Sequence, residues 1–122
     1  MEDQPQSLYD KYGGQETVDK MTKMSHDLTM ADETLRPFFD GVDEERLLAH
    51  ESRFIAMALG GPNNYEGRSL REAHKRLALT DENFDRFVGH ITDTMDAHGF
   101  TEDDIATVIE GIEQTRGEVL NR

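Results

Sequence analysis

The stretch REAHKRLAL, residues 71–79, places a histidine in a short helical pattern directly after an irregular segment. Leu70, His74 and Leu77 are spaced i, i+4 and i+7, so they lie on one face of a helix. The preceding residues 60–69, GGPNNYEGRS, are rich in Gly, Pro and Asn and predict a long loop. The pattern puts an imidazole on an apolar helical face, where it is either an ordinary core histidine or a ligand.

Length and composition bound the class of protein. The chain of 122 residues is long enough for one hydrophobic core, and we expect a polar extension over 1–6 followed by one domain over 7–122. It contains no cysteine, which excludes disulfides and thiolate metal sites. Because it has neither a long apolar run nor a signal-peptide pattern, we expect a cytoplasmic protein with no membrane contact.

The charge is strongly acidic, with 26 Asp and Glu against 13 Lys and Arg and a formal net charge of −13. Phosphate contacts need a basic patch, so nucleic-acid binding is not expected. Few of the basic residues are lysine. A lysine-poor acidic surface favours a halophilic source, since concentrated salt screens the self-repulsion; the alternative is an ordinary acidic protein.

The hydrophobic periodicity predicts an all-α fold with almost no strand signal. Asp43, Thr80 and Thr101 are suitable N-caps, Thr101 with Asp104 resembles a capping box, and Gly99 is a stop signal. We expect helices over residues 7–12, 16–30, 35–39, 43–59, the segment around His74, 80–98 and 101–120.

One apolar stripe contains unexpected polar residues. In the helix over 43–59, His50 and Glu51 fall on the stripe formed by Leu47, Phe54 and Ile55. A buried carboxylate is costly unless it is paired or protonated, so the pattern indicates a polar pocket within an apolar one. The alternative is that both side chains lie at the edge of the stripe and reach water.

The last two long helices have regular stripes that predict plain core, at Phe84, Phe87, Val88, Ile91 and Met95 and at Ile105, Val108, Ile109 and Ile112. The histidines lack the spacing of a protein-only metal site. We expect His90 to be solvated and His98 to lie at a helix C-terminus.

Four segments together resemble the group I (N-type) truncated haemoglobins. They are SLYDKYGGQETV (7–18), LRPFFDGV (35–42), FIAMALGGPNNYEGR (54–68) and LREAHKRLALTDENF (70–84). The resemblance implies a truncated globin fold, a two-over-two helical sandwich around non-covalently bound haem b. It also implies that His74 is the proximal iron ligand and that Phe39 packs on the haem face. Further pocket residues are expected at Leu47, Phe54, Leu70 and Phe87, with Arg46 and Arg71 as propionate partners.

The distal side departs from the family pattern. His26 aligns with a tyrosine that donates to bound O2, Leu47 takes the gate position, and Glu51 replaces a common glutamine. An ionised glutamate can only accept hydrogen bonds, so retention of O2 needs His26 as donor or a protonated Glu51. The stripe of Met21, Met24 and Leu28 faces away from His26, which predicts an exposed homodimer contact.

His50 resembles a histidine that coordinates iron from the distal side in cyanobacterial members. That resemblance implies a second metal ligand and a six-coordinate low-spin haem; alternatively, His50 points toward a propionate or solvent. Thr115 lies near the place of the histidine that some of these proteins bond to a haem vinyl, so covalent attachment is not expected.

The resemblance predicts a protein that reversibly binds O2, NO or CO. Two alternatives stay open at this point. One is an enzyme, a nitric oxide dioxygenase served by an external reductase. The other is a bis-histidine protein for electron transfer or redox sensing.

The net charge generates a first prediction. With 26 acidic and 13 basic side chains, the thermal midpoint should rise markedly between low and molar NaCl, because screening relieves like-charge repulsion. Calorimetry across a salt series measures this, and a midpoint that stays flat over that range contradicts the halophilic interpretation.

Overall fold

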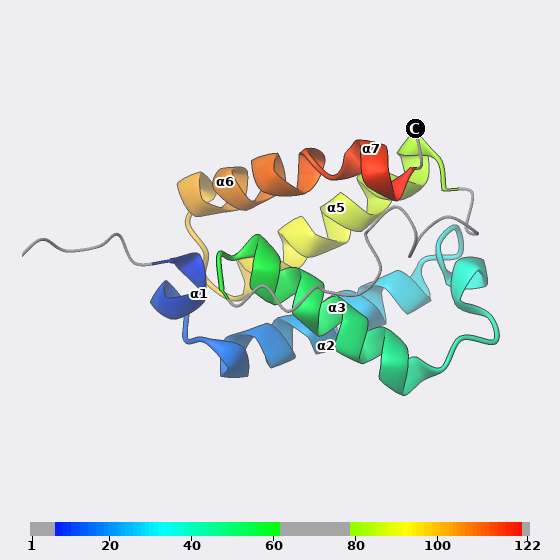
Figure 1. The fold of residues 1–122 in the computed structure, drawn as a ribbon, viewed down its shortest axis with the longest axis horizontal. Coiled ribbons are helices and arrows are strands. Elements are labelled where there is room, and N and C mark those ends of the chain that lie inside the picture. Colours follow the sequence, from blue (N-terminus) through cyan, green and yellow to red (C-terminus); the bar gives the residue numbers. More distant parts are fainter. Residues whose placement is uncertain (1–6, 62–78, 121–122) are drawn as a thin grey trace, which may run out of the picture.

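The computed structural model describes residues 7–61 and 79–120, and within these ranges the regular elements are all helical (Figure 1). They are α1 (Leu8–Lys11), α2 (Gln15–Ala31), η1 (Arg36–Phe39), α3 (Glu44–Ala58), α5 (Asp81–Ala97), α6 (Glu102–Glu113) and α7 (Arg116–Val119). The predicted all-α class is confirmed for these residues. The extension over 1–6 and the expected helix carrying Leu70, Arg71 and His74 lie outside the described residues.

The predicted caps begin the helices where the sequence placed them. The Asp43 carboxylate accepts from the backbone N–H groups of Glu45 and Arg46, at the start of α3. Thr80 and Asn83 form a reciprocal capping box at the start of α5, each side chain accepting from the other residue's N–H. These contacts satisfy N–H groups that have no partner within the helix.

The final helix is interrupted, which the sequence pattern did not predict. Instead of one helix over 101–120, α6 ends at Glu113 and α7 begins at Arg116. At the break, the Thr115 hydroxyl and the Thr115 N–H both donate to the Ile112 carbonyl, at 2.7 and 2.9 Å. These bonds to the third preceding residue tighten the turn and stop the regular α-helical pattern.

The helices form two stacked pairs. α2 contacts both α3 and α5, and α5 in turn contacts α6, so the α2–α3 pair lies against the α5–α6 pair (Figure 1). A single hydrophobic core fills the space between them, and all four helices contribute to it. Its most buried apolar side chains are Val18, Met21, Ile55, Leu59, Ile91, Met95, Val108 and Ile112.

The buried face of α2 differs from the predicted one. It consists of Val18, Met21, Thr22, Ser25, His26 and Thr29, spaced three and four residues apart. Met21 is 1% exposed inside the monomer, whereas Met24 and Leu28 are half-buried. The predicted homodimer contact is therefore wrong at Met21. The hydrophobic pattern pointed to the wrong face because most residues on the buried face are small or polar.

Close backbone approaches fix α1 on the rest of the fold. A Cβ atom on Gly61 would lie 2.4 Å from the Tyr9 ring, so only glycine fits there. The Tyr12 ring stacks on Phe100 with 3.7 Å between ring centroids, and its hydroxyl donates to Asp104 at 2.5 Å. Helix α1 is thereby fixed to the first turn of α6.

Arg116 joins α7 to the first turns of α5. Its guanidinium lies 2.9 Å from Asp81, 2.5 Å from Asp85 and 2.8 Å from Glu113. The same group lies over the Phe84 ring, 4.4 Å from the ring centroid. These four contacts hold the short C-terminal helix beside Phe84.

Candidate functional site

A cavity of about 750 Å³ lies among α2, η1, α3 and α5. This volume is within the range of small-molecule and cofactor sites. Aromatic and aliphatic side chains form most of its wall, chiefly Leu35, Phe38, Phe39, Leu47, Phe54, Phe84 and Phe87. A few polar side chains interrupt that wall, namely Thr29, Arg46, His50, Glu51, Arg53 and Asn83.

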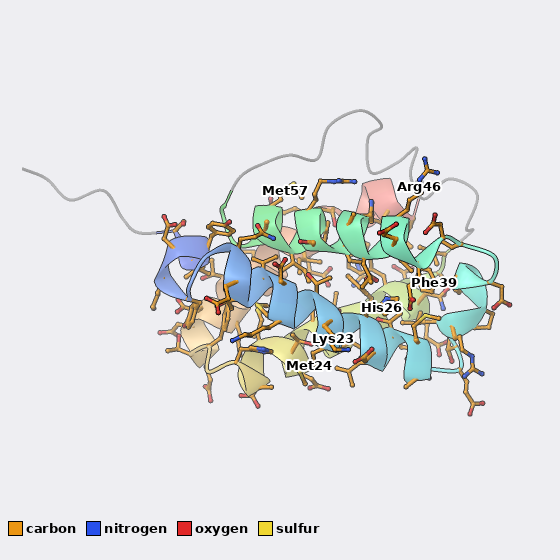
Figure 2. The ribbon with its side chains drawn as sticks, turned by 90° about the horizontal axis from the view of Figure 1, so that it is seen from below. Lys23, Met24, His26, Phe39, Arg46 and Met57 are labelled. Atoms are coloured by element: carbon orange, nitrogen blue, oxygen red, sulfur yellow. The ribbon has the colours of Figure 1, made fainter. Side chains whose placement is uncertain are left out.

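The cavity brings together most of the predicted pocket residues that the structure describes. Its lining includes Phe39, Arg46, Leu47, His50, Glu51, Phe54 and Phe87. His26 does not line the cavity but contacts Glu51, which does. Figure 2 shows His26, Phe39 and Arg46 toward the same end of the molecule. The roles of all these residues toward a cofactor stay predictions, as do those of Leu70, Arg71 and His74.

Several lining residues were missed by the sequence analysis. Phe84 was assigned to plain core, yet it faces the cavity. Thr29 carried a usable signal, since it lies one helical turn after His26 on the buried face of α2. Val119 lines the cavity from α7, a separate helix that the periodicity did not reveal.

His26 bridges two carboxylates of α3. Its Nδ1 lies 3.1 Å from Glu51 Oε1, and its Nε2 lies 3.1 Å from Glu44 Oε2. Glu44 and Glu51 are seven residues apart, which places them on one face of the helix, two turns from each other. Glu44 is exposed, whereas His26 and Glu51 are buried. The imidazole therefore connects a surface carboxylate to one in the cavity wall.

The bridge differs from the predicted arrangement of His26, whose role toward a ligand stays a prediction. Both ring nitrogens face carboxylate oxygens, so neither is directed at a ligand in the cavity. An imidazolium donates to both partners, and a neutral imidazole donates to only one. The contact ties the Glu51 carboxyl group to the neighbouring helix α2.

Glu51 is the buried carboxylate that the stripe pattern predicted. Its exposed fraction is 8%, so the alternative in which it reaches water at the edge of the stripe is wrong. Burial raises the pKa of the Glu51 carboxyl from 4.5 to about 7, while the charge and hydrogen bond of His26 oppose that rise. Near neutral pH, Glu51 therefore exists both as a carboxylic acid that donates and as a carboxylate that only accepts.

The remaining histidines have separate surroundings. His50 lines the cavity and is half-buried. His90 is also half-buried, and its Nε2 lies 2.9 Å from Asp32, so the side chain is only partly solvated and has an acidic partner. His98 ends α5 as predicted, and its Nδ1 donates to the Thr94 carbonyl at 2.8 Å.

The described part of the chain contains neither a cluster of metal-binding side chains nor a membrane-spanning helix. No group of three or more His, Cys, Asp or Glu side chains in residues 7–61 and 79–120 is arranged to hold a metal ion. None of the helices in those ranges is long and apolar enough to cross a membrane.

Comparison with known proteins identifies the family. The bacterial-like globin family matches residues 7–121. A group 1 truncated haemoglobin of Tetrahymena pyriformis is 31% identical over 118 residues, which cover 97% of this chain and 98% of that protein. A group 1 truncated haemoglobin of Synechocystis is 34% identical over 122 residues, covering 95% of this chain and 98% of that protein.

Solved structures agree with the sequence relatives. The Fe(III) form of the Tetrahymena pyriformis truncated haemoglobin superposes with a TM-score of 0.87 at 31% identity, covering 94% of this chain and 98% of that one. The 2/2 haemoglobin of Synechococcus, in its cyanomet state with covalently attached haem, gives a TM-score of 0.88 at 33% identity, covering 96% and 100%. These matches confirm the predicted two-over-two fold, and the chain belongs to the bacterial-like globins as a group 1 truncated haemoglobin.

Proposed function

We propose that the cavity between α3 and α5 holds non-covalent haem b and that the protein reversibly binds a diatomic ligand, O2, NO or CO, there. The observation that carries the proposal is the aromatic cavity of about 750 Å³, with the buried Glu51 in its wall, in a chain of this family. Ferrous haem iron, when bound, supplies the coordination position for the ligand. The side chains of the cavity determine how the cofactor and the ligand are held.

The residues present fit such a cofactor. The rings of Phe54 in α3 and Phe87 in α5 are tilted by 56° with their centroids 6.2 Å apart, and Phe39 adds a third ring from η1. Arg46 is exposed although it lines the cavity, so its guanidinium is available to a propionate at the rim. The apolar wall and the cationic rim match the two parts of a porphyrin.

His74 is proposed as the proximal iron ligand. Support comes from the resemblance of LREAHKRLALTDENF to the family segment. Further support comes from Leu79, five residues later, because it lines the cavity where the described chain resumes. Thr115, near the place of the histidine that bonds a haem vinyl in some relatives, donates to the Ile112 carbonyl and offers no imidazole. Non-covalent binding is consistent with this.

Glu51 is proposed as the polar residue that faces the bound ligand, and His26 as the residue that holds Glu51 in place. O2 held by a ferrous haem would carry added electron density, so a hydrogen-bond donor would stabilise it and a carboxylate would repel it. The protonated form of Glu51 is therefore the form that favours O2. Its raised pKa makes that form available near neutral pH.

A second candidate function is favoured by the position of one histidine. His50 lines the cavity from α3, which is consistent with a six-coordinate bis-histidine haem in a redox protein. A ferric absorption spectrum separates the two candidates, because a low-spin spectrum indicates distal ligation by the protein and a high-spin spectrum indicates an open or water-bound site. The nitric oxide dioxygenase alternative and its external reductase stay predictions.

The proximal role of His74 is tested by His74→Gly. The wild-type protein should give a Soret band on addition of haem. The variant should lose stable haem binding, or hold iron whose normal spectrum free imidazole restores. His90→Gln is the matched control, because His90 pairs with Asp32 and does not line the cavity. A spectrum that His74→Gly leaves unchanged rules out this assignment, and a wild-type protein with no Soret band rules out the proposed function.

The burial of Glu51 predicts a pH-dependent stability. The pKa of Glu51 is about 7 in the folded protein and 4.5 ordinarily, so the folded state binds the proton of this carboxyl group more tightly. The resulting contribution to the free energy of unfolding is fully present below pH 4.5 and is lost as pH rises through about 7. Glu51→Gln removes this loss. In haem-free protein, the variant should be more stable than wild type by about 1 to 3 kcal/mol at pH 8 and by much less at pH 4.5.

Urea unfolding at a series of pH values measures the difference. Glu44→Gln is the control, since it alters the other partner of His26 at an exposed carboxylate. A stability difference between Glu51→Gln and wild type that does not vary with pH contradicts the assigned burial effect.

A further inference from the structure

Thr29 has a buried hydroxyl with no hydrogen-bond partner. The residue is 1% exposed and lines the cavity from α2. Among the described residues, its Oγ1 is the buried side-chain polar atom left without a partner. Buried hydroxyls are normally hydrogen-bonded, because leaving one unpaired costs free energy. The unpaired hydroxyl of Thr29 therefore needs an explanation.

Four other helical threonines satisfy their hydroxyls within their own helix. Each of the following donates to the carbonyl four residues earlier: Thr22 at 2.7 Å, Thr92 at 2.8 Å, Thr94 at 2.8 Å and Thr107 at 3.1 Å. Thr29 lies inside α2, where the Ser25 carbonyl offers the same partner, yet it does not use it. The hydroxyl is thus left available to whatever occupies the cavity.

We infer that the Thr29 hydroxyl donates a hydrogen bond to the small ligand that the cavity holds. This inference rests on the proposed function, and it deepens it by naming a ligand-selecting residue. A hydroxyl supplies one donor, which suits a diatomic ligand that carries negative charge, as O2 does on ferrous iron, and does little for nearly apolar CO. Thr29 should therefore favour O2 over CO.

The position of Thr29 accounts for an otherwise missing donor. His26 occupies the place of the family's tyrosine donor, but both of its ring nitrogens are engaged by Glu51 and Glu44. Thr29 lies three residues further along the same buried face of α2. In this chain, two residues of α2 therefore have different roles. His26 holds Glu51, and Thr29 offers the proton of a neutral hydroxyl to the ligand. Unlike Glu51, that donor persists at every working pH.

The test compares Thr29→Val with Thr22→Val in the haem-loaded protein. Both changes replace a hydroxyl by a methyl group of similar size, and both residues are buried on α2. Thr29→Val should speed O2 dissociation by about three- to tenfold, the effect of losing one hydrogen bond. CO dissociation should change little, while the C–O stretching frequency of the ferrous complex rises. Thr22→Val should leave the O2 rate and the C–O frequency as in wild type.

A conservative variant and the stability of haem-free protein give two further tests. Thr29→Ser retains the hydroxyl and should keep O2 dissociation near the wild-type rate. In haem-free protein, Thr22→Val should lower the thermal midpoint, because Thr22 loses its bond to Val18, whereas Thr29→Val should not. Unchanged O2 rates and C–O frequency in haem-loaded Thr29→Val overturn this inference alone. A wild-type protein that takes up no haem overturns the proposed function and this inference with it.

Discussion

The site depends on the burial of one carboxylate, Glu51, in a wall that is otherwise mostly apolar. Such a group is tolerated only with a partner, and His26 supplies it from the neighbouring helix at 3.1 Å. His26 is in turn held by Glu44 at the surface end of α3. The pairing of α2 with α3 is therefore both a hydrophobic contact and a polar one, and the polar part lies beside the cavity.

This constraint explains the composition of α2. A helix that had only to fill a core would bury large apolar side chains, whereas α2 buries Thr22, Ser25, His26 and Thr29 beside Val18 and Met21. Small side chains let α2 pack closely against both α3 and α5, with which it makes its main contacts. Polar groups on that face then reach the cavity and its charged wall. The same turns of α2 therefore pack against the neighbouring helices and carry polar groups at the cavity.

Much of the fold could be predicted from the sequence because its signals are local. The caps at Asp43 and Thr80, the stop at Gly99 and the stripes of α5 and α6 all depend on residues a few positions apart. The buried face of α2 could not be predicted in this way, since its small polar residues give no hydrophobic signal and Met24 and Leu28 suggested another face.

Within the site, too, features that depend on nearby residues could be predicted, and features that depend on how helices pack could not. The polar stripe of α3 was visible, and the resemblance pointed to Phe39, Leu47 and Glu51. The bridge from His26 to both Glu44 and Glu51 depends on how two helices pack, so spacing along one helix could not reveal it. The orphaned hydroxyl of Thr29 could not be foreseen either, because a threonine in a helix ordinarily bonds to its own backbone.

The Arg116 contacts bear on the order in which the chain acquires its structure. The carboxylates around Arg116 are 3, 31 and 35 residues away along the chain, whereas Lys11 must find Asp104 across 93 residues. Closing a short loop costs less conformational entropy, and local contacts speed folding. We therefore expect α5, α6 and α7 to assemble as a nucleus onto which the N-terminal helices dock, an order that pulse-labelled hydrogen exchange during refolding resolves. In that order, α5 and α7, which Arg116 holds together, would form one wall of the cavity first. The wall from α2 and α3 would be added when the N-terminal helices dock.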